Sequence, residues 1–391
     1  MPRATPPLPG GDRGATVSIR EVDVRITGAV LEESGRPGPY AATRPLAVDE
    51  LELAPPGPTE LLVRIEVAGV CHSDLSVVDG NRPRPMPMLL GHEAAGIVEQ
   101  AGAEVRDVRV GDRVVLTFLP RCGRCAACAT DGRLPCEPGS AANAAGGLLA
   151  GGTRLTRRGE PVAHHLGASA FADHAVVDRR SVVPVPADVP AEVAALLGCA
   201  VLTGGGAVLN ASGVREGEPV LIVGLGGVGT AALLVARATG HPVIAVDAVE
   251  SKLAHALACG ADAAWTPQQA LDEGVRAAAV IEAAGHPAAF ETAFGLTAPG
   301  GTTVTVGLPR ADARSTVAPL TLTAEARTVV GSYLGSSVPA RDVPHYADLW
   351  LEGRLPVERL VSGRMPLARI NEAMDALAGG GALRQLITFE R

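Results

Sequence analysis

The chain has 391 residues, a formal net charge of −8 and 47% hydrophobic residues. This length favours two domains, and the composition supplies enough apolar material for a core in each. No run of five Lys or Arg occurs, so neither a nucleic acid nor an anionic membrane is an expected partner.

The first residues are rich in Pro and Gly, and we expect residues 1–19 to form a flexible N-terminal extension. They contain no apolar run typical of a secretory signal. The apolar stretches elsewhere are interrupted before eighteen residues, so we expect no transmembrane helix and no membrane partner. The sequence therefore predicts a cytoplasmic protein.

The first third of the chain is β-rich. Short, β-branched runs bounded by Gly or Pro predict strands at residues 60–70, 96–100 and 110–118. Residues 120–170 are rich in Gly, Ala and Arg with weak periodicity, and we interpret them as an extended lobe. Strand character resumes at residue 171.

The pattern changes near residue 190. Residues 192–209 predict a helix. Apolar strands are then predicted at 219–223, 243–248, 277–285 and 302–308, and helix-length segments separate them. This alternation is typical of a parallel, doubly wound sheet. Residues 367–380 predict a late helix, and 384–389 a final strand.

Four cysteines lie within fifteen residues, at Cys122, Cys125, Cys128 and Cys136. In a chain without a secretory signal, clustered cysteines indicate a metal rather than disulfides. Four thiolates suit a closed, tetrahedral structural zinc site. An iron–sulfur cluster or unrelated buried thiols are the alternatives, although the spacing differs from the bacterial ferredoxin run. The lobe by itself does not establish an enzyme.

Three residues from separate segments form a second candidate metal site: Cys71, His92 and Cys199. Two thiolates and one imidazole, with a fourth position open, make a catalytic zinc arrangement. Each cysteine taken singly is more simply a small buried side chain. The remaining Cys259 precedes a glycine at a predicted helix end, and we expect it to be inert.

The cofactor motif is G-x-G-x-x-G, formed by Gly224, Gly226, Gly227, Val228 and Gly229. It follows an apolar strand and opens a helix-length segment, the context in which glycines let the backbone approach a pyrophosphate. Asp247 lies eighteen residues after Gly229, at the end of the next strand. A carboxylate there binds ribose hydroxyls and repels a 2′-phosphate, so the sequence predicts NAD rather than NADP.

Several motifs together resemble the zinc-dependent medium-chain alcohol dehydrogenases: GVCHSD (69–74), LLGHEAAGIV (89–98), the four-cysteine lobe, LLGC (196–199) and LRQLITF (383–389). The segment from the lobe to residue 174 looks most like the class III branch, which includes thiol-dependent formaldehyde dehydrogenases. The resemblance implies a GroES-like catalytic domain (20–200 and 334–391) with a zinc lobe (120–137), and a Rossmann coenzyme domain (201–333). It also implies a homodimer or homotetramer.

The resemblance also assigns roles near the catalytic zinc. Glu93 is the carboxylate that can approach the metal, Asp74 steadies a ligand, and Ser73 binds the alcohol and begins its proton relay. A structural ion pair is the alternative for Asp74 and Glu93. At the position five residues after Cys71, where the family has a relay histidine, this chain has Ser76.

For the cofactor, the resemblance implies contacts of His72 and Arg384 with the pyrophosphate, Lys252 with the ribose and Thr203 with the nicotinamide, and it adds Val228 and Val306. Lys252 and Arg384 could instead be ordinary surface charges. The substrate pocket would include Phe118, Leu308 and Tyr333, and such a lining suggests medium-length or aryl primary alcohols. These side chains could equally be simple core residues.

The sequence thus predicts an enzyme with two zinc ions per chain that transfers a hydride between a primary alcohol or aldehyde and NAD. Three alternatives remain. One is oxidation of an S-hydroxymethyl thiol, and another is a non-catalytic zinc and nucleotide-binding member of the same family. The third, a zinc-ribbon nucleic-acid binder, is disfavoured by the net charge of −8.

Overall fold

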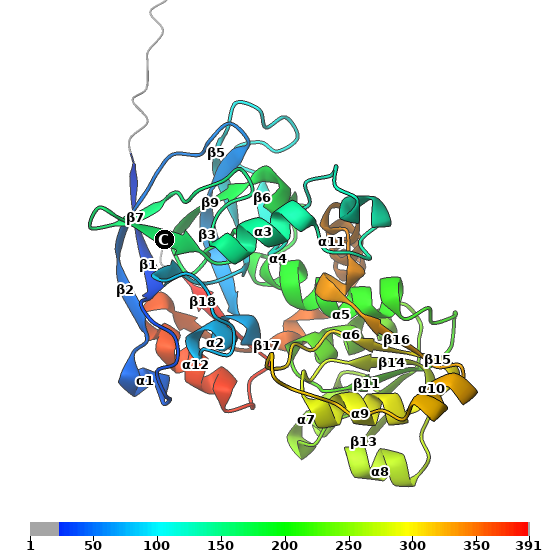
Figure 1. The fold of residues 1–391 in the computed structure, drawn as a ribbon. Helices are drawn as coiled ribbons and strands as arrows, with labels where there is room; N and C mark the ends of the chain where they lie inside the picture. Colours follow the sequence, from blue (N-terminus) through cyan, green and yellow to red (C-terminus); the bar gives the residue numbers. More distant parts are fainter. Residues whose placement is uncertain (1–22, 390–391) are drawn as a thin grey trace, which may run out of the picture.

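The computed structural model describes residues 23–389 and contains three sheets (Figure 1). The expected extension at residues 1–19 lies outside the described residues. A small closed barrel begins the fold. Its strands, in order, are β1 (Val24–Leu31), β2 (Leu46–Leu53), β7 (Leu155–Arg157), β8 (Glu160–His164) and β4 (Met88–Leu89).

The second sheet has seven strands and is mainly antiparallel. Its central strand β3 pairs with β5, β9 and β18, so the end of the chain returns to its beginning. The order is β10 (Val182–Pro184), β6 (Arg113–Leu116), β5 (Glu93–Ala101), β3 (Glu60–Val70), β18 (Arg384–Thr388) and β17 (Val361–Pro366), with β9 (His174–Asp178) paired to β3.

The third sheet has six strands that all pair in parallel. Side chains on its strand β11 alternate between the two faces, as a strand requires. Val220 and Ile222 pack with helices α6 and α7, whereas Leu221 and Val223 pack with α8 and α9. The strands, in order, are β13 (Ala263–Trp265), β12 (Val243–Val246), β11 (Val220–Val223), β14 (Ala277–Glu282), β15 (Thr297–Thr305) and β16 (Thr328–Gly331).

Both faces of the centre of this sheet are therefore covered by helices, which explains why its strands β11, β12 and β14 are apolar. The covering helices are α6 (Gly227–Ala238), α7 (Glu250–Ala258), α8 (Pro267–Asp272) and α9 (Pro287–Gly295), and the short α10 (Pro319–Ala324) follows β15. A β-rich part beside a doubly wound parallel sheet confirms the expected fold class.

A continuous apolar helical segment joins the two parts. It consists of α4 (Ala191–Leu196), a π-helical turn η3 (Leu197–Val201), α5 (Leu202–Gly206) and a second π-helical turn η4 (Ala207–Ala211). Glycines let it approach α6, because a Cβ on Gly204 would lie 2.3 Å from the Val228 carbonyl oxygen. The expected domain boundary at 200/201 falls inside this segment, so the domain limits stay a prediction.

Residues 191–211 also correct one expectation. Their length and hydropathy would suffice to cross a membrane, contrary to the expectation that no apolar stretch is long enough. However, 89% of the most apolar window is buried inside the protein, as in a core helix.

The segment 120–170 is more regular than its weak periodicity predicts, since it contains α3 (Glu137–Ala145) and two barrel strands. The remaining helices are α1 (Tyr40–Thr43), α2 (His72–Val78), α11 (Pro339–Leu351) and α12 (Ile370–Ala378). Short turns lie at η1 (Ala127–Thr130), η2 (Arg179–Ser181), η5 (Tyr333–Ser336), η6 (Val357–Leu360) and η7 (Leu367–Arg369).

Candidate active site

Three elements bring Cys71, His92 and Cys199 together in the interior. Cys71 is the N-cap of α2, His92 immediately precedes β5, and Cys199 lies in the π-helical turn η3. Their ligand atoms all lie within 4.8 Å of one another, and all three residues are buried. Two thiols and one imidazole are the donor set of a zinc site with an open fourth position, so these residues fit a catalytic zinc ion.

Asp74 determines how the His92 ring is oriented. Its Oδ1 lies 3.0 Å from His92 Nδ1, and its two oxygens also accept hydrogen bonds from the backbone N–H groups of Cys71 and Gly91. Burial alone would raise the pKa of Asp74, but the neighbouring His92 and His165 hold it below its usual range. A carboxylate that binds Nδ1–H leaves Nε2, which lies 3.5 Å from Cys199 Sγ, free for a metal.

His165 is a site residue that the sequence analysis missed. It follows β8 directly, its Nδ1 lies 3.1 Å from Asp74 Oδ1, and its ring is perpendicular to that of His92 at a centroid distance of 5.3 Å. Burial lowers the pKa of His165, while Asp74 acts against this shift. The only sequence signal was a His-His pair within a segment of weak periodicity, with no ligand spacing around it.

Glu93 and Arg384 form a buried ion pair beside the candidate zinc site. Glu93 Oε1 accepts a hydrogen bond of 3.0 Å from Arg384 Nε, and Oε2 accepts one of 3.2 Å from the Ala200 N–H. Burial raises the pKa of Glu93, and the positive charge of Arg384 opposes this rise. Arg384 also approaches the glycine motif, because a Cβ on Gly227 would lie 2.2 Å from its Nη1. This arginine therefore links the two candidate binding sites.

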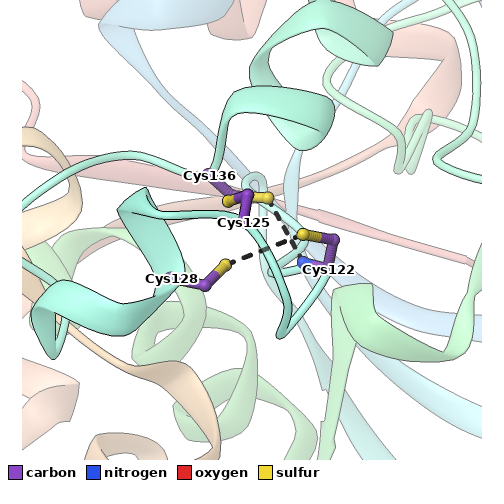
Figure 2. Close-up of side chains that lie close together, drawn as sticks. All are labelled: Cys122, Cys125, Cys128 and Cys136. Carbon is purple, nitrogen blue, oxygen red and sulfur yellow. Dashed lines mark hydrogen bonds between the residues drawn. The ribbon is translucent and has the colours of Figure 1, made fainter.

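The four lobe cysteines converge on one point (Figure 2), and their sulfur atoms all lie within 4.8 Å of one another. A tetrahedron of Zn–S bonds of about 2.3 Å places its sulfurs about 3.8 Å apart, and the Cys122 and Cys128 sulfurs are 3.9 Å apart. Hydrogen bonds from backbone N–H groups, chiefly that of Arg124, lower the pKa of Cys122 to about 6. The lobe thus fits a single closed zinc ion.

One cavity of about 480 Å³ extends from the candidate zinc site to the glycine motif. Most of the predicted cofactor and substrate residues line it, although they come from both parts of the fold. Its walls include Cys71, His72, Ser73, Phe118, Cys199, Thr203, Gly224, Gly226, Gly227, Val228, Asp247, Lys252, Val306, Leu308, Tyr333 and Arg384. Gly229 lies outside this wall: a Cβ there would be 1.8 Å from the Gly224 carbonyl oxygen, so its place is fixed by packing.

Asp247 stands where the glycine loop meets the second strand of the parallel sheet. Its two oxygens accept hydrogen bonds from the N–H groups of Leu225 (2.7 Å) and Val249 (2.9 Å). The residue is 9% exposed and faces the cavity. These bonds fix the carboxylate in place at the site predicted to hold a ribose.

Aromatic rings line the cavity beside the candidate zinc site, where the substrate is predicted to bind. The rings of Phe118 and Tyr333 meet edge to face at 5.6 Å, and Phe118 also meets the His92 ring at 5.6 Å. Leu308 is 46% exposed, so it lies at the open side. Ser73 and Ser76 both line the cavity, but the Ser76 hydroxyl donates a hydrogen bond of 2.8 Å to the His72 carbonyl oxygen.

Comparison with known proteins matches two family models to the chain: the alcohol dehydrogenase GroES-like domain over residues 57–187 and the zinc-binding dehydrogenase over residues 227–352. Geraniol dehydrogenase from Castellaniella defragrans is 37% identical over 365 residues, which are 88% of this chain and 95% of that protein.

Two solved structures show the same fold over nearly the whole chain. An alcohol dehydrogenase zinc-binding domain protein from Burkholderia ambifaria has 33% identity and a TM-score of 0.87, covering 94% of this chain and all of its own. Benzyl alcohol dehydrogenase from Acinetobacter calcoaceticus has 30% identity and a TM-score of 0.85, with the same coverage. This chain therefore belongs to the medium-chain, zinc-dependent alcohol dehydrogenase family and has its two parts, a GroES-like domain and a Rossmann-like dehydrogenase domain.

Proposed function

We propose that the protein is an NAD-dependent dehydrogenase of primary alcohols, with aryl or medium-length unsaturated alcohols as substrates. The observation that carries this proposal is one cavity lined by the candidate ligands Cys71 and Cys199, the aromatic pair Phe118–Tyr333 and the glycine motif. Geraniol and benzyl alcohol, the substrates in the names of two relatives, are both primary alcohols with an unsaturated carbon next to the carbinol carbon.

Each of these residues has a separate role in the proposed reaction. Zinc, when bound by Cys71, His92 and Cys199, supplies a Lewis acid that lowers the pKa of an alcohol and polarises a carbonyl. Asp74 holds His92 in the tautomer that suits a ligand. The Ser73 hydroxyl hydrogen-bonds the substrate oxygen and begins the path of its proton to solvent. Phe118 and Tyr333 exclude water from the reacting carbon.

The preference for NAD rests on Asp247. Backbone N–H groups hold both of its oxygens in place, and a carboxylate at this position repels a 2′-phosphate. We expect kcat/KM with NAD to be much higher than kcat/KM with NADP. The substitution Asp247→Ser should reduce the difference between these two values. Equal use of both cofactors by the wild type would contradict this assignment.

Two further proposals concern composition and assembly. The chain binds two zinc ions, one in each cysteine site, and acts in the cytoplasm as a homo-oligomer. Strand β16 supports the assembly, because within residues 23–389 it pairs only with β15 and leaves Val329 40% exposed. Edge strands of this kind pair readily with another copy. Val329→Lys should therefore reduce the oligomer mass in analytical ultracentrifugation.

The deciding experiment measures NADH formation by the zinc-loaded enzyme with a panel of alcohols, with and without a low-molecular-weight thiol. Turnover of benzyl alcohol and geraniol without thiol supports the proposal. Turnover of formaldehyde only when a thiol is present would replace it with the S-hydroxymethyl thiol alternative, which none of the matched relatives named above supports. No turnover of any substrate would leave the non-catalytic alternative.

A further inference from the structure

Two arginines of one short segment were not part of the predicted site, and of these only Arg82 is among the residues that line the cavity. Arg82 lines the cavity, and Arg84 follows two residues later, in the segment between α2 and β4. Each precedes a proline, Pro83 or Pro85, which confines its backbone to extended conformations. The two guanidinium groups are thus carried on a segment with little freedom to rearrange.

Neither arginine has a carboxylate partner among residues 23–389, whereas Arg64, for example, pairs with Glu99. The nearest acidic side chain in sequence, Asp79, is already engaged, because both of its oxygens accept hydrogen bonds from Asn81. Arg84 is only half exposed, and its Nε is buried without a hydrogen-bond acceptor. A buried donor without an acceptor is unfavourable, so this site is incomplete without a further group.

The charges of these arginines reach the residues that surround the substrate. Burial raises the pKa of Tyr333, and the positive charges of Arg84 and Arg82 act against that rise. Arg82 and Arg84 therefore lie near enough to Tyr333, on the cavity wall, for their charges to act on it.

A third arginine at the opening, Arg310, behaves differently. Its Nη1 donates a hydrogen bond of 2.7 Å to Asn81 Oδ1, and its Nε lies 3.3 Å from Asp312. This contact joins the coenzyme part to the segment that carries Arg82 and satisfies Arg310 without a ligand. Among residues 23–389, Arg84 thus keeps a buried Nε without an acceptor, and Arg82 lines the cavity without a carboxylate partner.

We propose that Arg82 and Arg84 bind an anionic group at the end of the substrate remote from its carbinol carbon, so that the preferred substrates are anionic primary alcohols such as aryl alcohols bearing a carboxylate. This inference rests on the proposed function. Hydrogen bonds from arginine to a carboxylate are about twice as strong as neutral ones, and the planar guanidinium suits a carboxylate geometrically. The aromatic wall would hold the ring, and the two arginines would hold the charge.

The test compares three substrates that share the benzyl alcohol core and differ in the para substituent, in the zinc-loaded enzyme with saturating NAD: benzyl alcohol, 4-(hydroxymethyl)benzoate and 4-(hydroxymethyl)benzylamine. We expect kcat/KM for the anion to exceed that for the neutral alcohol by about tenfold or more, and the cation to be the poorest. In Arg82→Met and Arg84→Met, the ratio of kcat/KM for 4-(hydroxymethyl)benzoate to kcat/KM for benzyl alcohol should fall severalfold. The control is Arg158→Met, an exposed arginine paired with Asp49 in the barrel, which should preserve the ratio.

If the wild-type enzyme oxidises benzyl alcohol but its kcat/KM for 4-(hydroxymethyl)benzoate is no higher, the inference is overturned and the proposed function stays intact. This comparison needs no variant, so it stands even if a substitution impairs folding. An unchanged ratio with a raised KM for NAD in both variants would also overturn it, because the arginines would then serve the cofactor. Formaldehyde with glutathione is a further arm: preferred turnover that depends on both arginines would support the inference and identify the anion as that of a thiol adduct.

Discussion

His165 Nδ1 lies 3.1 Å from Asp74 Oδ1, the same oxygen that holds His92 Nδ1 at 3.0 Å. Both histidine rings and the carboxylate are buried. Asp74 therefore lies against the candidate zinc ligand His92 and also against His165, which follows β8 in another part of the chain.

We predict that His165→Phe weakens zinc retention at the catalytic site. A partner behind a metal-bound histidine typically contributes about 10–100-fold in metal affinity or activity, and we expect the lower part of this range. The measurement is the rate of zinc loss to a chelator, together with the visible spectrum of the cobalt-substituted enzyme, which reports ligand geometry. His241→Gln is the control, a buried histidine of the coenzyme part whose Nδ1 lies near the Glu218 carbonyl. Unchanged spectrum and zinc retention in His165→Phe would show that His165 only fills space.

The two cysteine sites should respond differently to single substitutions. Cys136→Ser removes a thiol that also accepts hydrogen bonds from the N–H groups of Cys122 and Gly139, so it should lower thermal stability and promote aggregation. Cys199→Ser should leave a folded chain with little activity. Elemental analysis should find about two zinc ions in the wild type and about one in each variant, with the lobe ion resisting mild chelation because its coordination is closed. One zinc ion in a folded, active wild type would contradict this prediction.

The features that could be predicted from the sequence are those carried by rare residue types at fixed spacing. The four lobe cysteines and the glycine motif are local patterns, and the central strands β11, β12 and β14 of the parallel sheet are apolar because helices cover both of their faces. Cys71, His92 and Cys199 lie far apart in the chain, but two thiols and one imidazole are the donor set of a catalytic zinc ion, and this chemistry allowed them to be grouped.

The features that were missed depend on tertiary pairing. Strands β7 and β8 have three and five residues and form only because β2 and β4 are beside them in the barrel. His165 is placed at Asp74 by this same barrel, so no local pattern could assign it. Arg82 and Arg84 look like ordinary surface charges until the structure shows that they lack partners within residues 23–389.

His164, next to His165, provides a pH-dependent test of the barrel. Its side chain is fully buried, its Nε2 accepts the Arg154 N–H at 3.2 Å, and burial lowers its pKa to about 3. Below a pH of about 6.5, the usual histidine pKa, this side chain binds a proton in the unfolded chain but not in the folded chain. The contribution of His164 to the free energy of unfolding is therefore complete above about pH 6.5 and is lost as the pH falls below that value. The loss between pH 7 and pH 5 is about 2 kcal/mol.

We therefore expect the melting temperature of His164→Gln to fall less between pH 7 and pH 5 than that of the wild type. His174→Gln is the opposite control. A hydrogen bond to Asp173 raises the pKa of His174, so its contribution is complete below about pH 6.5 and is lost as the pH rises through the raised value. Parallel melting curves for the wild type and His164→Gln at both pH values would contradict the assignment.

The last prediction concerns the path of the substrate proton, where this chain has Ser76 in place of the relay histidine of its family. A serine hydroxyl cannot act as a base near neutral pH, whereas histidine titrates there. The structure adds a second reason, because the Ser76 hydroxyl already donates its proton to the His72 carbonyl oxygen at 2.8 Å within α2. Ser73, two residues after the candidate ligand Cys71 and on the cavity wall, is the remaining hydroxyl of this turn.

Ser73→Ala should therefore reduce kcat by about 10²–10⁴-fold, the usual scale of positioned acid–base catalysis. Ser76→Ala should change kcat little, and it serves as the matched control because it removes the same hydroxyl group from the same helix. Ser76→His would introduce a group that titrates near neutral pH, and it should raise turnover at low pH if proton release limits the rate. Steady-state kinetics across pH, with the solvent isotope effect, distinguish these cases. A Ser76→Ala enzyme as impaired as Ser73→Ala would make Ser76 an obligatory member of the relay, since its hydroxyl would then have to leave the His72 carbonyl during turnover.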